Sequence, residues 1–348
     1  MKATTIHAPF DIRLSEVDAP SILAPTDAIV RITASCICGS DLWPYRGEND
    51  ITAGARIGHE FVGIVEETGS EVSTVRPGDF VIAPFMFSDN SCPHCRAGIQ
   101  SACTHGGFWG AQDHEGRPVD GGQGEYARVP LADGTLVATP EVPDDALVPS
   151  LLALSDVMGT GWHAAVAAGV KQGDTVVVVG DGAVGLSGVL AASRMGAERV
   201  VVMSRHASRQ KIAQEFGATD IVAERGEEGE AAIRELTGGV GADAVLECVG
   251  TGQSMNTAIT IARPGATVGY VGVPHGVELP VRSMFSRNVG VAGGIAPVRE
   301  YLPQLRDEVL SGAINPGLVF DLELPLSEVA EGYAAMHERR AVKTLLRP

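Results

Sequence analysis

The chain has 348 residues, with 26 Lys or Arg and 43 Asp or Glu, which gives a formal net charge of −17 at pH 7. This length is typical of two domains, and the 45% hydrophobic and 20% charged residues exclude wholesale disorder. The acidic balance opposes nucleic-acid binding, which needs a basic face, and adhesion to anionic membranes.

Up to about Ser150 the chain consists of short, β-rich segments that are interrupted by Gly and Pro. The predicted strands are Ala28–Ala34, Phe61–Glu66, Asp79–Ala83 and Tyr126–Pro130. Their spacing predicts a barrel-like, all-β unit over residues 1–151.

From about Leu151 onward, apolar strands alternate with helices. We expect strands at Thr175–Val179, Arg199–Met203, Asp220–Val222, Ala244–Cys248, Ala266–Val271 and Val289–Ala292. We expect helices at Ala183–Met195, Ser208–Phe216, Glu230–Leu236 and Met255–Ala262. Apolar strands that alternate with helices are typical of a parallel sheet covered on both faces. Six of them predict a doubly wound, Rossmann-type α/β domain over residues 152–293.

The last part of the chain, residues 294–348, is expected to return to the first domain. It predicts a helix at Val298–Leu310, a strand at Leu318–Leu324 and a helix at Ser327–Met336. The predicted fold class is therefore α/β, with a β-barrel domain and a doubly wound parallel sheet.

The beginning of the sequence, MKATTIHAPF, has no apolar region like that of a signal peptide, and no apolar run reaches the ~18 residues of a spanning helix. Six cysteines in so long a chain, most of them clustered, indicate metal chemistry in a reducing compartment. We therefore expect a soluble, cytoplasmic protein that binds a small molecule and neither nucleic acid nor membrane.

A glycine-rich turn follows the apolar run at 176–179 and precedes a predicted helix. It reads Gly180-Asp181-Gly182-Ala183-Val184-Gly185, which is G-x-G-x-x-G. In this context the pattern predicts a dinucleotide site. Gly180 permits the tight turn, Gly182 admits the pyrophosphate, and Gly185 allows the helix to pack closely on the strand. Free N–H groups at the helix N-terminus bind the pyrophosphate.

The end of the next strand bears on the choice of cofactor. NAD sites place Asp or Glu there to bind the ribose 2′-hydroxyl. This strand ends in Ser204 and Arg205, Arg209 follows, and no carboxylate is available at the tip. A hydroxyl and two guanidinium groups suit a 2′-phosphate, so we predict NADP(H) in preference to NAD(H). The alternative is that both arginines are merely solvated.

Three segments carry residue types that bind zinc. They are Cys38-Gly39-Ser40-Asp41, Gly58-His59-Glu60-Phe61-Val62-Gly63 and Ser155-Asp156-Val157-Met158-Gly159-Thr160-Gly161. Together they resemble the zinc-dependent medium-chain alcohol dehydrogenases, whose signature G-H-E-x-x-G is present. The Asp156 segment resembles a bacterial secondary-alcohol and polyol branch, in which Asp replaces a third Cys ligand, and the Ser204-Arg205 tip resembles its NADP-dependent members. The resemblance covers essentially the whole chain, and it implies a GroES-like catalytic domain followed by a Rossmann domain.

The resemblance implies a catalytic zinc held by Cys38, His59 and Asp156. Glu60 is then a carboxylate beside the ligands, or a fourth ligand when substrate is absent. Three protein ligands leave one position open for substrate, as catalytic zinc requires. Zinc acts there as a Lewis acid on the carbonyl or alkoxide oxygen, and hydride passes to or from the nicotinamide.

The resemblance also suggests roles for residues around that zinc. Ser40 matches the hydroxyl that contacts the substrate oxygen, Thr160 a position beside the nicotinamide, and Lys343 a residue that reaches the cofactor phosphates. Trp43 stands where many relatives have His, and an indole cannot shuttle a proton at neutral pH. Either the proton leaves by another route, such as the cofactor ribose and water, or Trp43 shapes the substrate pocket, or it only packs.

A second cluster resembles the structural-zinc lobe of the same family. Cys92, Cys95 and Cys103 match three of its four cysteines, and the first position is Asp89. An Asp-Cys₃ tetrahedron is chemically acceptable for zinc. The alternatives are His94 as fourth ligand, a water molecule, or an empty lobe.

The sequence therefore predicts an NADP(H)- and zinc-dependent alcohol dehydrogenase or carbonyl reductase. The alternatives are a zinc-free reductase of activated C=C bonds from the same superfamily, of the enoyl or quinone type, and a non-catalytic cofactor-binding protein. Family habit implies a homodimer or homotetramer.

Overall fold

The computed structural model describes all 348 residues, and they form two compact units. The first unit contains residues 1–156 and 297–348, and the second contains residues 157–296. The boundaries lie a few residues later than the predicted ends of the β-rich and Rossmann segments.

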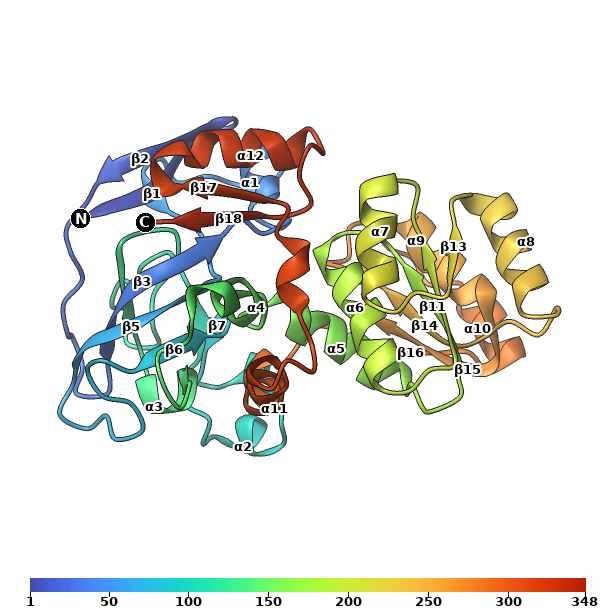
Figure 1. Cartoon of the computed structure of the whole chain (residues 1–348), viewed down its shortest axis with the longest axis horizontal. Coiled ribbons are helices and arrows are strands. Elements are labelled where there is room, and N and C mark those ends of the chain that lie inside the picture. The colour runs from blue at the N-terminus through green and yellow to red at the C-terminus, as the bar shows by residue number, and fades with distance from the viewer. The chain divides into compact units, whose positions relative to one another are not determined.

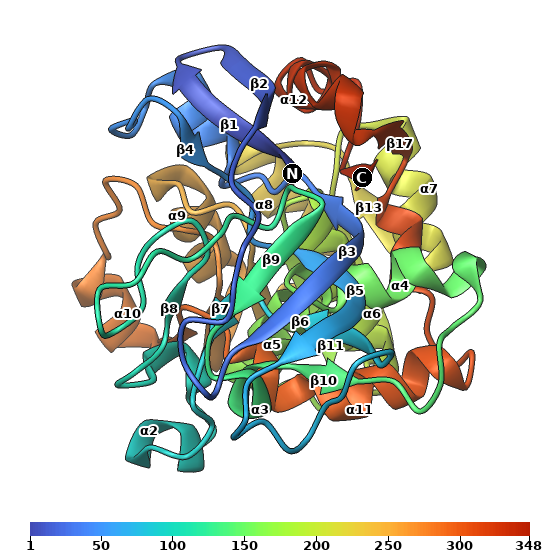
Figure 2. The ribbon, with the colours of Figure 1, turned by 90° about the vertical axis from the view of Figure 1, so that its left-hand side faces the viewer.

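A curved, mostly antiparallel sheet forms the centre of the first unit (Figure 2). Its strands are ordered β10-β6-β5-β3-β18-β17, and β9 also pairs with β3. The bounds are β3 Ala28–Cys36, β5 Phe61–Thr68, β6 Phe80–Ala83, β9 Tyr126–Val129, β10 Val137–Ala138, β17 Leu322–Pro325 and β18 Thr344–Arg347. The predicted strands are thus present, and a separate three-stranded sheet of β1 (Lys2–Ala8), β2 (Asp11–Glu16) and β4 (Ala55–Arg56) was not predicted.

The end of the chain returns to this sheet, as the sequence predicts. Strand β18 lies antiparallel beside β3, with Leu345 opposite Cys36 and Leu346 opposite Ser35 (Figure 1). Helices α11 (Val298–Leu310) and α12 (Val329–His337) precede it. The predicted strand Leu318–Leu324 is only partly correct, because Pro316–Val319 forms a 3₁₀ turn and β17 begins at Leu322. The Gly317 N–H in that turn donates to Ser150 Oγ, which holds it out of the sheet.

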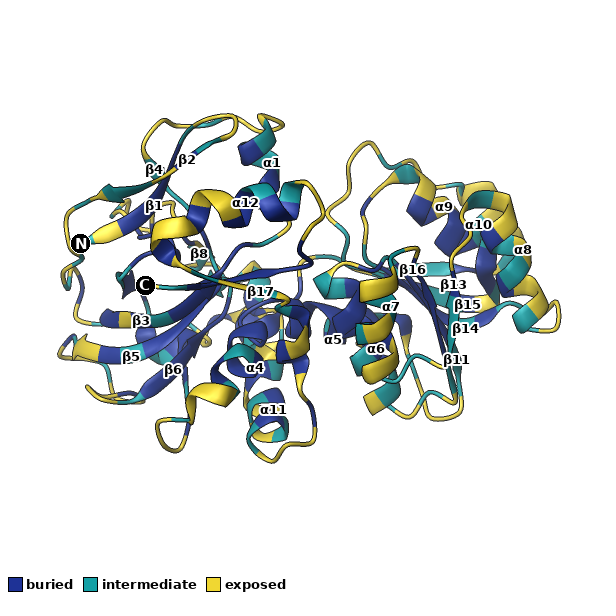
Figure 3. Cartoon of the chain, turned by 45° about the horizontal axis from the view of Figure 1, so that its top comes forward, coloured by how far each residue is buried: buried dark blue, intermediate teal, exposed yellow.

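The second unit is built on a six-stranded parallel sheet in the order β13-β12-β11-β14-β15-β16. The strands are β11 Thr175–Val179, β12 Arg199–Met203, β13 Asp220–Val222, β14 Ala242–Glu247, β15 Ala262–Tyr270 and β16 Gly290–Gly293. The helices that follow the first strands are α6 Ala183–Arg194, α7 Ala207–Glu215, α8 Gly226–Leu236 and α9 Gly252–Ile261. Figure 3 shows β11 and β14 buried, whereas α6 and α7 each present one exposed side. This order is that of a doubly wound nucleotide-binding sheet.

Helix α5 (Val157–Ala168) begins the second unit and was not predicted. Most of its residues are buried, including Trp162 and Met158, so it lacks the polar side that marks a surface helix. It packs closely on α6, because a Cβ atom added at Gly161 would lie 2.5 Å from the backbone nitrogen of Gly188. Another helix that the sequence did not indicate is α10 (Val281–Arg287).

Candidate metal centres and cofactor site

The first metal-binding segment is a tight turn at the end of β3. Asp41 closes it: its Oδ2 accepts the backbone N–H of Cys38 at 3.0 Å and the side-chain amide of Gln123 at 3.1 Å. The Cys38 carbonyl in turn accepts the Asp41 N–H at 3.2 Å. The position of the Cys38 sulfur is therefore determined by a short, internally bonded loop.

Four side chains of the first unit converge beyond this turn. Their ligand atoms lie within 4.8 Å of one another, and they belong to Cys38, His59, Glu60 and Asp156. His59 Nε2 is 3.5 Å from Asp156 Oδ2, and Cys38 Sγ is 3.8 Å from the same oxygen. Tetrahedral zinc ligands with bonds of 2.0–2.3 Å are separated by about 3.3–3.8 Å, so these separations fit one ion.

The other ring nitrogen of His59 orients the imidazole. Nδ1 lies 3.4 Å from Asp41 Oδ1, so the ring presents Nε2 to Asp156 and Glu60. A carboxylate behind a ligating histidine is a common means of fixing the ring and raising its basicity. The sequence analysis included Asp41 in a motif but gave it no role.

The charges around this group favour a cation. Burial alone would lower the pKa of His59, but the carboxylate of Asp41, the thiol of Cys38 and the hydrogen bond to Asp156 raise it well above its ordinary value. Glu60 Oε2 is fully buried and has no hydrogen-bond partner. The cluster as a whole offers a thiol, an imidazole and two carboxylates, which are the ligand types that zinc takes. The donor set therefore fits zinc.

Lys343 lies next to this group and does not extend to solvent. Its Nζ donates to Glu60 Oε1 at 2.7 Å and to the Ile37 carbonyl at 3.2 Å, and it is 1% exposed. The β18–β3 pairing places it there, one residue before β18 begins. The structure thus gives Lys343 a buried position beside the candidate metal ligands. Its contact with the cofactor phosphates stays a prediction.

The remaining residues predicted near the reaction lie as follows. Ser40 is exposed on the turn that Asp41 closes, and Trp43 is half-buried in α1 (Leu42–Arg46). Thr160 is buried in α5, within the second unit.

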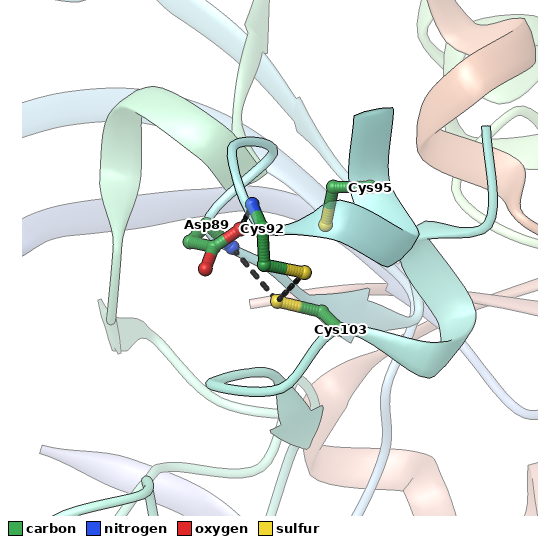
Figure 4. A group of neighbouring side chains, drawn as sticks. All are labelled: Asp89, Cys92, Cys95 and Cys103. Atoms are coloured by element: carbon green, nitrogen blue, oxygen red, sulfur yellow. Dashed lines mark hydrogen bonds between the residues drawn. The ribbon is translucent and has the colours of Figure 1, made fainter. Parts of the chain in front are cut away.

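The second cluster surrounds another point in the first unit (Figure 4). The ligand atoms of Asp89, Cys92, Cys95 and Cys103 also lie within 4.8 Å of one another. Asp89 follows β7 (Met86–Phe87). Cys92 directly precedes α2 (Pro93–Arg96), Cys95 lies within this helix, and Cys103 follows a 3₁₀ turn. The sulfurs of Cys92 and Cys103 are 4.0 Å apart, close to the ~3.8 Å expected of two thiolates on one zinc.

Hydrogen bonds favour the charged form of two of these side chains, Asp89 and Cys92, whereas burial raises the pKa of Cys95 and that of Cys103. Asp89 is partly buried, yet N–H groups of Ser91 and Cys92 and the ring of His105 hold its pKa well below its usual range. His105 Nδ1 lies 2.7 Å from Asp89 Oδ2. Backbone N–H groups of Cys95 and Thr104 lower the pKa of Cys92 to about 6, which makes the thiolate available. His94 is exposed and is not part of the group, and the role of His105 was not predicted.

The glycine-rich turn of the second unit connects β11 to α6. Gly180 has φ +119°, a conformation that favours glycine, and a Cβ at Gly185 would lie 2.1 Å from the Gly180 carbonyl oxygen. A Cβ at Gly182, the N-cap of α6, would meet no atom within 4 Å, which leaves room for a ligand. Ala183 and Val184 begin the helix, so their N–H groups are among those without an intrahelical partner.

The tip of β12 differs from its sequence-based interpretation. Ser204 is buried and Arg205 exposed, and Arg209 lies in the first turn of α7. A carboxylate is present there, contrary to the prediction: Asp181 Oδ2 accepts the Ser204 hydroxyl at 2.8 Å, and Asp181 Oδ1 lies 3.0 Å from Arg209 Nη1. The acid comes from the glycine-rich turn, 23 residues before Ser204.

None of the helices in either unit has the length and apolar character needed to cross a membrane.

Comparison with known proteins identifies the class. Residues 24–141 match the alcohol dehydrogenase GroES-like domain, and residues 183–311 match the zinc-binding dehydrogenase model. Zinc-type alcohol dehydrogenase B of Aspergillus flavus is 33% identical over 358 residues, which cover all of this chain and 81% of that protein. The chain belongs to the zinc-dependent medium-chain alcohol dehydrogenase family.

Solved structures support the same fold. The alcohol dehydrogenase TADH from Thermus sp. ATN1 has a TM-score of 0.91 and 31% identity, covering 100% of this chain and 99% of that one. A zinc-binding dehydrogenase from Sinorhizobium meliloti, solved bound to NADP, has a TM-score of 0.83 and 27% identity, with 100% and 99% coverage. The predicted fold class is confirmed. The family makes the protein an alcohol oxidoreductase that uses zinc, a nicotinamide cofactor and a small-molecule substrate.

The Asp89 cluster leads to a prediction about metal content. If His105 stabilises Asp89 as a ligand, His105→Ala should weaken zinc affinity at this cluster by about 10–100-fold. His94→Ala, in the same lobe but outside the group, should not. Titration of the purified protein with a chromophoric zinc chelator would measure both.

We expect two zinc ions per chain in the parent protein and in the His94 variant, one of which is lost readily from the His105 variant. A metal-to-chain ratio near one in the parent, or equal zinc retention in both variants, would contradict this assignment.

The buried Lys343–Glu60 pair leads to a second prediction. Lys343→Met leaves the Glu60 charge buried without its partner, so it should lower the free energy of unfolding by about 3–5 kcal/mol. The double variant Glu60→Gln with Lys343→Met should recover more than half of that loss. Denaturant unfolding of the metal-depleted proteins measures the free energy of unfolding of the parent and both variants. If Lys343→Met instead left stability unchanged and weakened cofactor binding, Lys343 would contact the cofactor phosphates after all.

Proposed function

We propose that this protein transfers hydride reversibly between NADP(H) and a secondary alcohol or polyol and its carbonyl counterpart, with zinc at the Cys38 cluster. The convergence of Cys38, His59, Glu60 and Asp156 within 4.8 Å carries the proposal. The family supplies the reaction class, and the Asp156 segment favours the secondary-alcohol and polyol branch.

Cys38, His59 and Asp156 would hold the zinc, with the Glu60 carboxylate as a further ligand within reach of it. A bound zinc supplies Lewis-acid stabilisation of the substrate oxygen while the nicotinamide gives or takes hydride. The anionic thiolate and the Asp156 carboxylate balance the charge of a divalent ion. Lys343 balances the charge of Glu60, because its ammonium donates to Glu60 Oε1 at 2.7 Å.

Ser40 relays the proton of the substrate hydroxyl in this scheme: its oxygen accepts that proton while its own hydroxyl proton passes to water. Its exposed position on the Cys38 turn allows this contact with water. Trp43 can donate through its indole N–H but cannot accept a proton there. We therefore place Trp43 in the wall of the substrate pocket and outside the proton route.

The preference for NADP(H) is proposed from the second unit. Ser204, Arg205 and Arg209 bring a hydroxyl and two guanidinium groups to the end of β12, although Asp181 from the glycine-rich turn contacts Ser204 and Arg209 there. A homologous dehydrogenase was solved bound to NADP. By family analogy we also propose that the protein assembles as a homodimer or homotetramer.

A substrate panel on protein of measured zinc content tests the proposal. Secondary alcohols and polyols should be oxidised with NADP⁺, and matching ketones reduced with NADPH. His59→Asn should lose zinc from the Cys38 cluster and lower turnover by about 10³-fold or more, because Lewis-acid stabilisation is worth several kcal/mol. His7→Asn, an imidazole of β1 outside the cluster, should retain both zinc and turnover.

Retained turnover in the His59 variant would refute the zinc assignment. More efficient use of NADH than of NADPH would refute the cofactor preference. Metal-independent reduction of an activated C=C bond, with no carbonyl turnover, would support the zinc-free reductase instead.

A further inference from the structure

The acid of the glycine-rich turn, Asp181, has no part in the chemistry described so far. It occupies the variable position between Gly180 and Gly182, and only 6% of it is exposed. Both of its carboxylate oxygens are engaged, one by the Ser204 hydroxyl and the other by the Arg209 guanidinium. The same Arg209 nitrogen also lies 3.4 Å from the Asp181 backbone carbonyl. One acidic side chain therefore binds two of the three groups that we assign to the 2′-phosphate.

The backbone holds this arrangement in place. Strands β11 and β12 are parallel neighbours, with Val179 opposite Met203, so residues just beyond both ends meet at the same edge of the sheet. The Ser204 N–H donates to the Val222 carbonyl at 3.0 Å, and the Ser204 carbonyl accepts the Gln210 side-chain amide at 2.8 Å. Since Ser204 is fixed on both sides, its hydroxyl is prearranged toward Asp181.

The charges at this edge have opposite effects on the two cofactors. A 2′-phosphate carries negative charge, so it is attracted by Arg209 and repelled by a nearby carboxylate. A ribose 2′-hydroxyl is a neutral donor that a carboxylate accepts, which is how NAD-binding folds recognise it. The Asp181–Arg209 ion pair cancels the guanidinium charge until something displaces the carboxylate.

We propose that Asp181 is a specificity-determining residue of the cofactor site, and that it limits the preference for a 2′-phosphorylated dinucleotide. A 2′-phosphate has to take Arg209 and Ser204 from Asp181, whereas an unphosphorylated ribose leaves both contacts in place. This inference rests on the proposed function only in assuming that the dinucleotide binds at the glycine-rich turn.

Asp181→Asn tests the inference, because it removes the charge and keeps the size of the side chain. Dissociation constants would be measured for NADPH and NADH by fluorescence, and for 2′,5′-ADP and 5′-AMP by calorimetry. We expect binding of NADPH and 2′,5′-ADP to tighten about tenfold, the effect of freeing one charge-assisted partner. NADH and 5′-AMP should change by less than about threefold.

Asp220→Asn is the matched control. Asp220 is also paired with an arginine, Arg199 at 2.9 Å, but at the amino ends of β12 and β13 and so at the opposite edge of the sheet. It changes the net charge equally and should not alter the ratio of the NADH and NADPH dissociation constants. Asp181→Ser serves as a second variant if the amide disturbs the turn, which a loss of 5′-AMP affinity would reveal.

The inference is overturned if a variant that binds 5′-AMP normally keeps the parent ratio of NADH to NADPH affinity, or if Asp220→Asn shifts that ratio equally. A parent protein that binds NADH more tightly, together with an Asp181 variant shifted toward NADPH, supports the inference and refutes the proposed NADP(H) preference. The two failures are therefore distinguishable.

Discussion

The antiparallel pairing of β18 with β3 brings a compensating positive charge to the buried Cys38 cluster. That cluster gathers a thiol and several carboxylates into a buried volume, where like charges are costly. The pairing places the Lys343 ammonium 2.7 Å from Glu60, and neither side chain is accessible to solvent. With Glu60 compensated, Cys38 and Asp156 remain as the anionic pair that a divalent ion neutralises. The C-terminal return therefore supplies charge to the site as well as a strand to the sheet.

An ion pair also shapes the proposed cofactor site of the second unit. Arg209 would be an uncomplicated phosphate ligand if it were alone, but Asp181 binds it at 3.0 Å. If a 2′-phosphate binds there as we propose, it exchanges one anionic partner of Arg209 for another. In both units a charged side chain of the site is paired with an opposite charge from another segment of the chain: Glu60 with Lys343, and Arg209 with Asp181.

Prediction from the sequence was most accurate where a local pattern is sufficient. The β-branched runs of β11, β12 and β13 begin and end at the predicted residues, because buried parallel strands are continuous apolar segments between turns. The glycine-rich turn was predicted from its spacing between a strand and a helix, whereas the two groups of candidate zinc ligands were predicted from a resemblance to a known family. Helix α5 was not predicted, because it is buried on nearly all sides and shows no helical alternation of polar and apolar residues.

The residues that the sequence did not reveal are those whose role depends on a partner far away along the chain. Lys343 meets Glu60 across 283 residues, and Asp181 meets Ser204 across 23. The sequence analysis assigned no role to His105, yet its ring contacts Asp89, a candidate zinc ligand, from outside the group of four. A motif specifies which atoms can bind a metal or a phosphate. The charge that those atoms carry depends on tertiary neighbours, so ligand type could be predicted here more securely than the affinity and selectivity of either site.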